Sequence, residues 1–385
     1  MKKVKFSDIC IKIGSGATPK GGEQSYCDGG ISLIRSQNIL DYKFSSDGLA
    51  HINRIQAEKL QNVEVLENDI LLNITGDSVA RSCIVEKYYL PARVNQHVAI
   101  IRADVTKALP SYLLYYLQLN KEYLLQLASS GATRKALTKG MIENIEINLP
   151  SLDEQQKITI ILDTIQRKIN INNKINDNLL ELLQNIYKKY FKRIEVDASY
   201  RLSDICIYSK TKVPASKYNL NTYYSTENIL PQKAGVTQSS KLPKGTKVTA
   251  CHKGDTLISN IRPYFKKIFY CHEDCGCSND VLCFSPKEPL YSTYLFSTLY
   301  SDNFFYYVVS GAKGTKMPRG DKEQIMDYPI EIPPSNQLRE FNIVAVPLLE
   351  KVKIINDEKK SLKILRDTLL PKLMSGELDV SNIVL

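Results

Sequence analysis

The residues best suited to chemistry form a stretch rich in cysteine and histidine in the second half of the chain. The potential ligands in and near it are Cys206, Cys251, His252, Cys271, His272, Cys275, Cys277 and Cys283. Four thiolate or imidazole groups would complete a tetrahedral zinc site. However, the spacing Cys-x3-Cys-x-Cys-x5-Cys lacks the paired two-residue spacing of zinc ribbons, and the corresponding stretch 85–99 of the first half has no cysteine. We therefore predict buried thiols and no metal site, with zinc binding by residues 251–283 as the alternative.

Other signatures of catalysis are missing from the sequence. It contains no Asn/Asp-Pro-Pro-Tyr/Phe methylation motif, no glycine-rich cofactor loop after a predicted strand and no Walker loop. The segment Asp321-Lys322-Glu323 has the residue types of a nuclease site without its spacing, so a solvated charged loop is the better interpretation. The sequence predicts no catalytic residue in this chain.

Further polar residues have types suited to reading nucleic acid. Arginine, asparagine and glutamine match the donor and acceptor patterns of guanine and adenine edges, whereas cations that hold phosphates position a protein without specifying sequence. The base-reading candidates, at matched strand-to-loop positions of the two halves, are Arg35, Gln37, Asn38, Thr75, Asp77, Arg81, Thr226, Glu227, Asn228, Asn260, Arg262 and Tyr264. The phosphate-binding candidates are Lys20, Arg134, Lys135, Lys266, Lys267, Lys313, Lys316 and Arg319.

Composition favours a polyanionic partner. The 385 residues carry a net charge of +10, and the basic residues between Lys241 and Lys267 face only Asp255. A solvated basic surface is the alternative interpretation of that run. No apolar run reaches the length of about 18 residues that a membrane helix needs, and the nine cysteines come without a secretion signal. We therefore expect a cytoplasmic protein with reduced thiols and no membrane segment.

The candidate residues belong to a sequence that repeats itself. Ser7-Asp8-Ile9-Cys10-Ile11 returns as Ser203-Asp204-Ile205-Cys206-Ile207, and Ile147-Asn148-Leu149-Pro150 is matched by Ile330-Glu331-Ile332-Pro333. The offset falls from 196 residues (7 to 203) to 183 residues (147 to 330), as loop insertions and deletions would make it. We infer two copies of one unit. A pseudo-twofold protein has a natural target with two related halves, such as duplex DNA.

The first copy ends in a long helical pattern, because residues 151–191 contain neither proline nor glycine. Its seven-residue series is Ile158, Ile165, Asn172, Leu179 and Ile186. Ile161, Ile175 and Leu182 fall three residues later, and Leu162, Ile169 and Leu183 widen the stripe. This spacing is typical of a coiled coil, and Ser151 with Glu154 forms a capping box. Asn172 either fixes the register of a buried seam or is a solvated residue.

The second copy repeats the helical pattern with changes. Phe341, Leu348, Ile355, Leu362 and Leu369 occupy the same phase. Gly376 is the expected helix stop. Pro347 should kink the helix or delay its start.

The segments before the helices are predicted to form mixed α/β bodies. Strand-like runs occur at 31–34, 69–74 and 97–101 in the first copy and at 256–261 and 281–284 in the second. One aromatic helix is expected in each copy, at 111–127 and 291–309, with its rings in the core. We predict an α+β protein in which two pseudo-twofold-related mixed α/β domains, 1–150 and 194–334, are joined by two long antiparallel coiled-coil helices. The central helix spans 151–193, and the C-terminal helix with its tail spans 335–385. Such helices would set a fixed distance between two reading domains.

With these features the chain resembles the specificity (S) subunit of type I restriction-modification systems. The resemblance covers essentially the whole chain, and its marks recur in order in both copies. They are Ile145-Glu146-Ile147-Asn148-Leu149-Pro150, Leu152-Asp153-Glu154-Gln155, Ile330-Glu331-Ile332-Pro333-Pro334, Ile34-Arg35-Ser36-Gln37-Asn38-Ile39, Val94-Asn95-Gln96-His97-Val98 and Leu373-Met374-Ser375-Gly376-Glu377-Leu378. Gln337, in place of a glutamate, and Pro347 depart from the pattern.

The resemblance implies two target-recognition domains, 1–150 and 194–334, and a sequence-specific DNA-binding role without catalysis. The implied partners are double-stranded DNA with an asymmetric bipartite site, two modification (methyltransferase) subunits and restriction subunits. These subunits, and not this chain, would bring S-adenosylmethionine, ATP and Mg for adenine methylation and restriction. Two other classes are the alternatives: a stand-alone DNA-modifying or DNA-cleaving enzyme, and a coiled-coil scaffold that binds no DNA.

Overall fold

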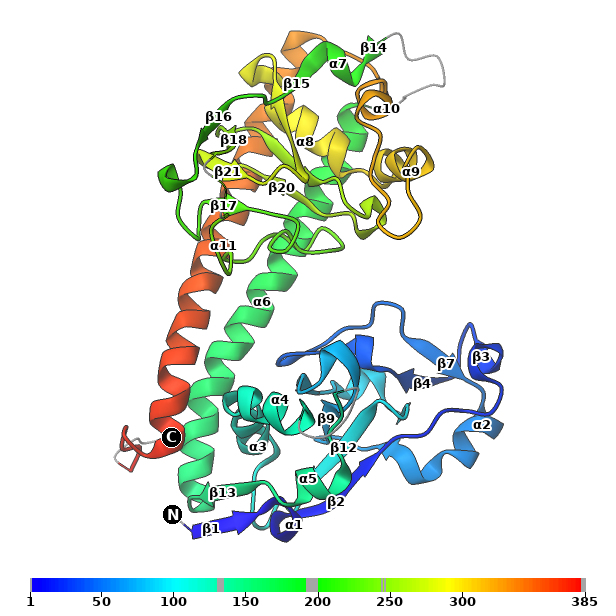
Figure 1. Cartoon of the computed structure of the whole chain (residues 1–385), viewed down its shortest axis with the longest axis vertical. Helices are drawn as coiled ribbons and strands as arrows, with labels where there is room; N and C mark the ends of the chain where they lie inside the picture. Colours follow the sequence, from blue (N-terminus) through cyan, green and yellow to red (C-terminus); the bar gives the residue numbers. More distant parts are fainter. Residues whose placement is uncertain (1, 130–134, 192–199, 244, 246, 382–385) are drawn as a thin grey trace. The chain divides into compact units, whose positions relative to one another are not determined.

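The computed structural model describes residues 2–129, 135–191, 200–243, 245 and 247–381. The chain divides into two compact units (Figure 1): unit 1 comprises Met1–Asn170 and Lys359–Leu385, and unit 2 comprises Ile171–Glu358. Each unit holds a mixed helix and sheet body and a part of both long helices, α6 (Leu152–Tyr190) and α11 (Ser335–Ser375). Among the described residues, no helix combines the length and the apolar character needed to cross a membrane.

The body of unit 1 is built on a four-stranded antiparallel sheet. Its strands, in spatial order, are β10 (Ser82–Ile84), β9 (Ile70–Asn73), β12 (Val98–Ala103) and β2 (Cys10–Ser15). The helices that share its core are α3 (Pro110–Leu119), α4 (Lys121–Ser129) and α5 (Lys139–Glu143). The rings of Tyr112 and Tyr115 in α3 are buried there, so these aromatics are core residues, as expected from their helical spacing.

A second sheet of unit 1 covers the other face of the first. Its five strands are β3 (Tyr26–Cys27), β7 (Ala50–Ile52), β4 (Ile31–Ile34), β11 (Ala92–Val94) and β8 (Glu64–Val65), of which β4 and β11 run parallel. Successive strand residues point to opposite faces. Ile70 and Leu72 therefore join the core beneath the helices, whereas Leu71 joins the core shared with the second sheet.

Short elements complete the body of unit 1. They are the pair β1 (Lys2–Lys5) and β13 (Glu146–Leu149), the pair β5 (Ile39–Leu40) and β6 (Lys43–Phe44), and the helices α1 (Phe6–Ile9) and α2 (Arg54–Lys59).

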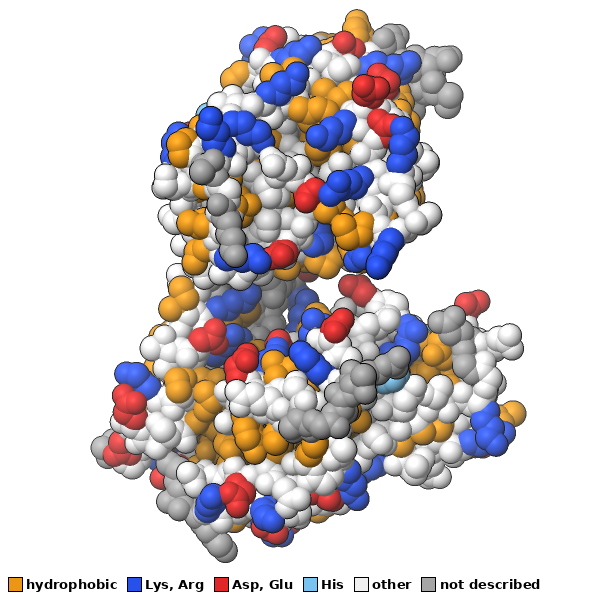
Figure 2. All heavy atoms as spheres, in the orientation of Figure 1, with side chains coloured by type: hydrophobic (Ala, Val, Ile, Leu, Met, Phe, Trp, Pro, Cys, Tyr) orange, Lys and Arg blue, Asp and Glu red, His pale blue; other side chains and the backbone are white. Residues whose placement is uncertain are grey.

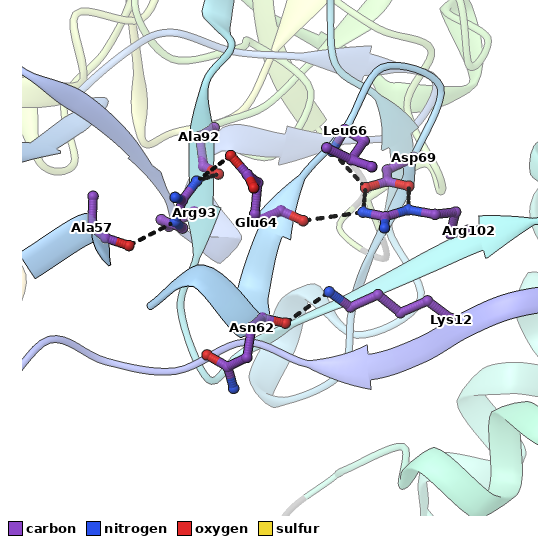
Figure 3. A network of polar contacts seen from close by, with 9 residues as sticks. All are labelled: Lys12, Ala57, Asn62, Glu64, Leu66, Asp69, Ala92, Arg93 and Arg102. Atoms are coloured by element: carbon purple, nitrogen blue, oxygen red, sulfur yellow. Dashed lines mark hydrogen bonds and ion pairs between the residues drawn. The ribbon is translucent and has the colours of Figure 1, made fainter. Parts of the chain in front are cut away.

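A network of ion pairs and hydrogen bonds, centred on Arg102, connects the two sheets of unit 1 (Figure 3). Arg102 of β12 makes two hydrogen bonds of 2.8 Å to the Asp69 carboxylate and donates to the carbonyl oxygen of Glu64 in β8 at 3.1 Å. Arg93 of β11 contacts the Glu64 carboxylate at 3.0 Å. The buried Asp69 side chain also accepts the Leu66 N–H. The hydrogen bonds with Asp69 raise the pKa of the Arg102 guanidinium.

Unit 2 repeats this architecture. Its four-stranded antiparallel sheet has the order β15 (Cys206–Tyr208), β22 (Val281–Pro286), β19 (Thr256–Ser259) and β20 (Ile268–Tyr270). Its second sheet has the order β16 (Lys212–Pro214), β18 (Lys247–Cys251), β21 (Cys275–Cys277) and β17 (Tyr223–Tyr224), with β17 parallel to β21. Its helices are α7 (Leu202–Ile205), α8 (Ser292–Tyr300), α9 (Asp302–Ser310) and α10 (Lys322–Met326), and its short pair is β14 (Tyr200–Arg201) with β23 (Pro329–Ile330).

The strand registers of the two units are equivalent. Ile70 pairs with Ile101 across β9 and β12, and Thr256 pairs with Phe284 across β19 and β22. Directly before these strands, the Asp69 and Asp255 carboxylates each accept the N–H of the residue three positions earlier. The predicted duplication and the mixed helix and sheet class are therefore confirmed.

The long helices run antiparallel within unit 2. The side-chain amide of Asn172 donates to the Glu358 carboxylate, and that of Asn176 donates to the Asn356 side-chain oxygen, both at 2.8 Å. Both asparagines of α6 are buried. This burial supports the interpretation of Asn172 as a residue that fixes register, because a solvated residue would be exposed.

The buried seam of α6 differs in part from the predicted one. The buried residues of α6 are Gln155, Ile158, Thr159, Leu162, Ile165, Ile169, Asn172, Asn176, Leu183 and Tyr187. Leu162, Ile169 and Leu183, which were predicted to widen the stripe, are buried as expected, so the second position of the heptad lies four residues after the first and not three. The assignment of Ile175 and Leu182 to the seam is wrong, since their side chains are 38% and 46% exposed.

Helix ends follow the sequence signals in part. The capping box of α6 is confirmed, because the Ser151 N–H donates to the Glu154 carboxylate at 2.9 Å and the Glu154 N–H donates to Ser151 Oγ at 3.3 Å. The stop of α11 is confirmed at Gly376, whose φ is +78°. A delayed start at Pro347 is not observed, because α11 already begins at Ser335.

Each predicted aromatic helix consists of two helices. The segment 111–127 falls into α3 and α4, and the segment 291–309 falls into α8 and α9. Ser301 accounts for the second break, because its hydroxyl accepts the N–H of Phe304 and caps α9.

Candidate nucleic-acid interface

The base-reading candidates of unit 1 lie in loops at one end of its four-stranded sheet. The side-chain amide of Asn73, at the end of β9, donates to the carbonyl oxygen of Ser36 at 2.9 Å. Thr75 Oγ1 lies 2.6 Å from Nδ1 of His97, in the turn before β12. These contacts bring together three loops that are distant in the sequence.

Two of the candidates are structural residues. Asn38 and Asn228 are both buried. The Asn38 side-chain oxygen accepts the Arg35 N–H, and its amide donates to two carbonyl oxygens at 3.0 and 3.1 Å. Asn228 accepts the Ser225 N–H in the same way and donates twice at 3.0 Å. Because all polar atoms of both side chains are used within loops, neither can read a base edge, and the prediction for Asn38 and Asn228 is corrected.

The residues beside these asparagines lie nearer the surface. Gln37 and Glu227 are exposed, and Arg35 and Thr226 are half-buried. Arg35 Nη2 donates to the carbonyl oxygen of Gly48 at 2.6 Å, and the Gln37 amide donates to the same oxygen at 3.2 Å. The loop therefore presents Gln37 in unit 1 and Glu227 in unit 2 at matching places.

A chain of polar contacts leads to Thr75. The Thr18 hydroxyl donates to Gln96 Oε1, and the amide nitrogen of Gln96 lies 3.0 Å from His97 Nε2. His97 Nδ1 lies 2.6 Å from Thr75 Oγ1, so the His97 ring links the loop of Gln96 to the loop of Thr75.

The other candidates of unit 1 lie at the edge of this surface. Asp77, Lys20 and Lys135 are exposed, and Arg81 is half-buried. The carbonyl oxygen of Lys135 accepts the Gly76 N–H at 3.3 Å, which places Lys135 beside the loop of Asp77. Arg134 lies outside the described residues.

The matching loop of unit 2 is 260–264, after β19. The Arg262 N–H donates to the carbonyl oxygen of Pro318 at 2.8 Å, so the loop 313–320 lies beside it. Asn260 is buried and Arg262 is half-buried, whereas Tyr264 is 45% exposed. Strand register matches Thr75 with Ile261, not with Asn260, because Thr75 bridges to Ala136 and Ile261 bridges to Arg319.

Most basic candidates of unit 2 already have a partner. The ion pairs are Lys266–Asp302 at 2.8 Å, Lys313–Asp321 at 2.5 Å and Arg319–Asp280 at 2.9 Å. The Lys267 ammonium donates to the Thr226 carbonyl oxygen, and burial lowers the pKa of Lys267. Lys316 is exposed. Figure 2 shows Lys and Arg side chains over the visible face of unit 2, with Asp and Glu side chains among them.

Five of the six cysteines of unit 2 meet in one core, and Cys206 lies in another. Cys251, Cys271, Cys275, Cys277 and Cys283 are all buried in the shared core. The Cys275 thiol donates to the Cys271 sulfur at 3.5 Å, and burial raises the pKa of Cys271. Within the described ranges, no three His, Cys, Asp or Glu side chains are grouped so that they would hold a metal ion. The thiols pack as small core side chains.

Sequence reasoning missed several residues of this surface. His97 and Gln96 were read only as part of a recurring motif, and Asp280 and Asp302 were not singled out. Asp280 lies 183 positions after His97 (280 − 97), so the two residues occupy equivalent places before β22 and β12. The sequence already showed that these equivalent loop positions hold different residues, histidine in one copy and aspartate in the other. That difference could have marked both positions as candidates.

Comparisons with known proteins agree on one family. A family model described as "Type I restriction modification DNA specificity domain" matches residues 1–181 and 196–363. The MjaIX specificity subunit, a type I restriction enzyme subunit of Methanocaldococcus jannaschii, is 26% identical over 447 aligned positions that cover 100% of this chain and 94% of the relative. The HindI specificity subunit of Haemophilus influenzae is 23% identical over 164 positions, which cover 42% of this chain and 35% of that one.

One solved structure has a similar fold. The S subunit of a type I restriction-modification system from M. genitalium aligns with a TM-score of 0.56 at 15% identity, covering 97% of this chain and 95% of that chain. At this identity the likeness shows the fold alone.

Proposed function

Because the chain belongs to the family of type I restriction-modification DNA specificity domains, we propose that it supplies the DNA sequence address of a type I complex. In this role it binds double-stranded DNA at an asymmetric bipartite site and directs adenine methylation and restriction by partner subunits. Each unit reads one half-site, and the two half-sites lie about one helical turn, or ~10 bp, apart.

One observation carries the proposal: equivalent loop positions of the two units hold different chemistry. His97 of unit 1 contacts Thr75 at 2.6 Å, whereas Asp280 of unit 2 contacts Arg319 at 2.9 Å. The two units share one fold but present different hydrogen-bond donors and acceptors at this position. Each unit can therefore recognise a different half-site. A scaffold that binds no DNA gives no reason for such a difference, and neither does a stand-alone enzyme with one active site.

Exposed aliphatic residues on the long helices support the binding of two modification subunits. On α6 they are Ile160, Ile171 and Leu182, and on α11 they are Ile343, Ile354 and Leu365, all between 41% and 73% exposed. A spacing of eleven residues keeps each series on one helix face, since about 3.6 residues make a turn. The two series are related by the repeat offset of 183 (343 − 160). The same exposed aliphatic surface thus occurs once on each long helix, and each copy of it could bind one modification subunit.

The chemistry in this proposal belongs to the partners. Modification subunits bind S-adenosylmethionine, restriction subunits use ATP and Mg, and this chain contributes no catalytic residue or cofactor. The complex acts in the cytoplasm. The relatives named above are themselves specificity subunits, which supports this division of labour.

Methylome sequencing of a host with and without the chain tests the function. We expect methylated adenines in a motif with two unlike half-sites and an unread gap, and the motif should disappear when the chain is removed. A continuous or palindromic motif would refute the bipartite proposal.

Purified protein separates the alternative classes. Methyl transfer to DNA by the chain alone, with S-adenosylmethionine, would indicate a stand-alone enzyme. A complete failure to shift DNA at any salt concentration, with the modification subunits present, would indicate a scaffold. We expect a shift that weakens as salt rises, because phosphate contacts release counterions.

A further inference from the structure

An ion pair at the start of corresponding helices occurs in both units with its charges reversed. In unit 1, Lys121 at the first position of α4 contacts Asp41 at 2.5 Å. In unit 2, Asp302 at the first position of α9 contacts Lys233 at 2.9 Å and Lys266 at 2.8 Å. The helices α4 and α9 follow α3 and α8, so Lys121 and Asp302 both stand at the first position of corresponding helices.

The loops that these residues contact are also equivalent. The loop 40–43 is closed by the pairing of Ile39 with Phe44, and the loop 230–235 by that of Ile229 with Val236. Each loop begins just after the structural asparagine and the exposed reading residue of its unit. The ion pair therefore ties a reading loop to a helix in both units.

Backbone strain marks both loops. Tyr42 has a φ of +60°, and Gln232 and Lys233 have φ values of +54° and +59°. Such left-handed conformations are unfavourable for residues other than glycine and persist only where the surroundings hold them. The helix-bound ion pair is one of the contacts that hold them.

In unit 2 the contact holds two reading loops together. The Gln232 N–H donates to the carbonyl oxygen of Phe265 at 2.7 Å, and the Lys233 N–H donates to that of Lys266 at 3.0 Å. Lys266 belongs to the loop of Arg262, and both have left-handed backbones, with φ values of +50° and +51°. Two adjoining loops are thus fixed in strained conformations beside one carboxylate.

The two lysines are well enclosed. Their side chains are 15% and 22% exposed, and their ammonium groups lie 4.7 Å and 5.1 Å from the ring centroids of Tyr300 and Tyr306. Aromatic faces attract such cations. Lys233 and Lys266 are therefore held towards α9.

We propose that Lys121 and Asp302 are positioning residues, each of which holds the reading loops of its own unit in the conformation that gives half-site specificity. This rests on the proposed function. The reversal of charge carries the argument. A helix residue that held DNA phosphate would have to be positive in both units, but Asp302 is negative. A contact that only fixes a loop against a helix needs opposite charges on the two partners, in either order.

The decisive experiment compares Asp302→Ala with the charge-swapped variant Asp302→Lys/Lys233→Asp/Lys266→Asp, which reverses every charge of the contact so that the helix carries the lysine, as in unit 1. Full-length chain, assembled with its modification subunits, is titrated against DNA carrying the methylome motif and against DNA scrambled in one half-site. We expect Asp302→Ala to lower discrimination at the second half-site by about tenfold, the scale of one lost base contact. Discrimination at the first half-site should stay unchanged, and the charge-swapped variant should recover most of the loss.

Lys121→Ala is the matched control, and it should affect the first half-site alone. Equal losses at both half-sites, or no recovery in the swapped variant, would overturn the proposal. So would tighter binding of Asp302→Ala to all DNA, since that result would mean that freed lysines hold phosphates.

Hydrogen exchange gives a readout without DNA. Asp302→Ala should speed the exchange of amide hydrogens in 230–235 and 262–267 and leave that of 40–43 unchanged. Asp302→Asn keeps the shape of the side chain and removes only its charge, so it shows what the charge alone contributes. If hydrogen exchange were unchanged in both variants, the ion pair would not fix the loops, and the proposal would be wrong even if specificity fell. If wild-type complex shows no half-site discrimination, the proposed function fails, and the exchange data still decide whether the ion pair fixes the loops.

Discussion

Replacing Arg102 by methionine should destabilise unit 1 strongly. The substitution leaves the Asp69 carboxylate, whose side chain is 1% exposed, with only the Leu66 N–H as a partner. Removing one member of a buried ion pair costs about 3–5 kcal/mol because an uncompensated charge stays behind. The Arg102 side chain is 22% exposed, so the lower end, about 3 kcal/mol, is expected after screening by solvent.

Thermal unfolding measures the effect. For a body of this size a loss of 1 kcal/mol lowers Tm by about 2–4 °C, so the transition of unit 1 should fall by roughly 6–12 °C. The double variant Arg102→Met/Asp69→Asn removes the stranded charge and keeps an acceptor for Leu66, so it should be more stable than Arg102→Met alone.

The exposed ion pair Arg54–Glu58, with side chains 90% and 67% exposed, provides the control. Arg54→Met should cost no more than about 0.5 kcal/mol. If Arg102→Met cost as little as this control, or if the double variant were the least stable of the set, the reasoning from a buried and uncompensated carboxylate would be wrong.

Three further outcomes are expected. Lys266 and Lys233 lower the pKa of Asp302 to about 2. The stabilisation that ionised Asp302 gives is therefore fully present above about pH 4 and is lost as the pH falls towards 2. The melting temperatures of wild type and Asp302→Asn should differ at neutral pH and converge near pH 2. Ile343→Asp should reduce the bound modification subunits from two to one in native mass spectrometry, and two retained subunits would exclude that helix face as a binding surface. A seven-residue insertion after Asn176 adds about 10.5 Å of helix, and should lengthen the methylated motif's gap by about three base pairs; an unchanged gap with retained activity would show that the loops alone choose the spacing.

The architecture could be predicted well from the sequence because the same pattern of strands and helices occurs in both copies. Strand periodicity and turn residues placed β9 and β12 in one copy and β19 and β22 in the other to within about two residues. The seam of α6 was predicted less well, because Ile175 and Leu182 are as apolar as the residues that pack. Only the position of the opposing helix decides which aliphatic residues are buried.

The candidate site was predicted in part. Asn38 and Asn228 were chosen because they match between the copies, yet a residue that both copies share is better explained by the fold that they have in common. The pairing of Lys266 with Asp302 joins positions 36 residues apart (302 − 266). No local pattern of spacing shows that a loop lysine will meet the first turn of a distant helix, so the charge partners came only from the structure.

Unit 2 is one continuous segment, whereas unit 1 is made of two segments that flank it. A single exchange of the coding region for 171–358 between related genes would therefore replace one complete folded body and leave the other intact. Both crossover points would lie inside the helices α6 and α11, where the heptad phase must match but no reading loop is cut. Under the proposed function, such an exchange would combine one half-site with a new second half-site in a single recombination event, and neither core would be divided.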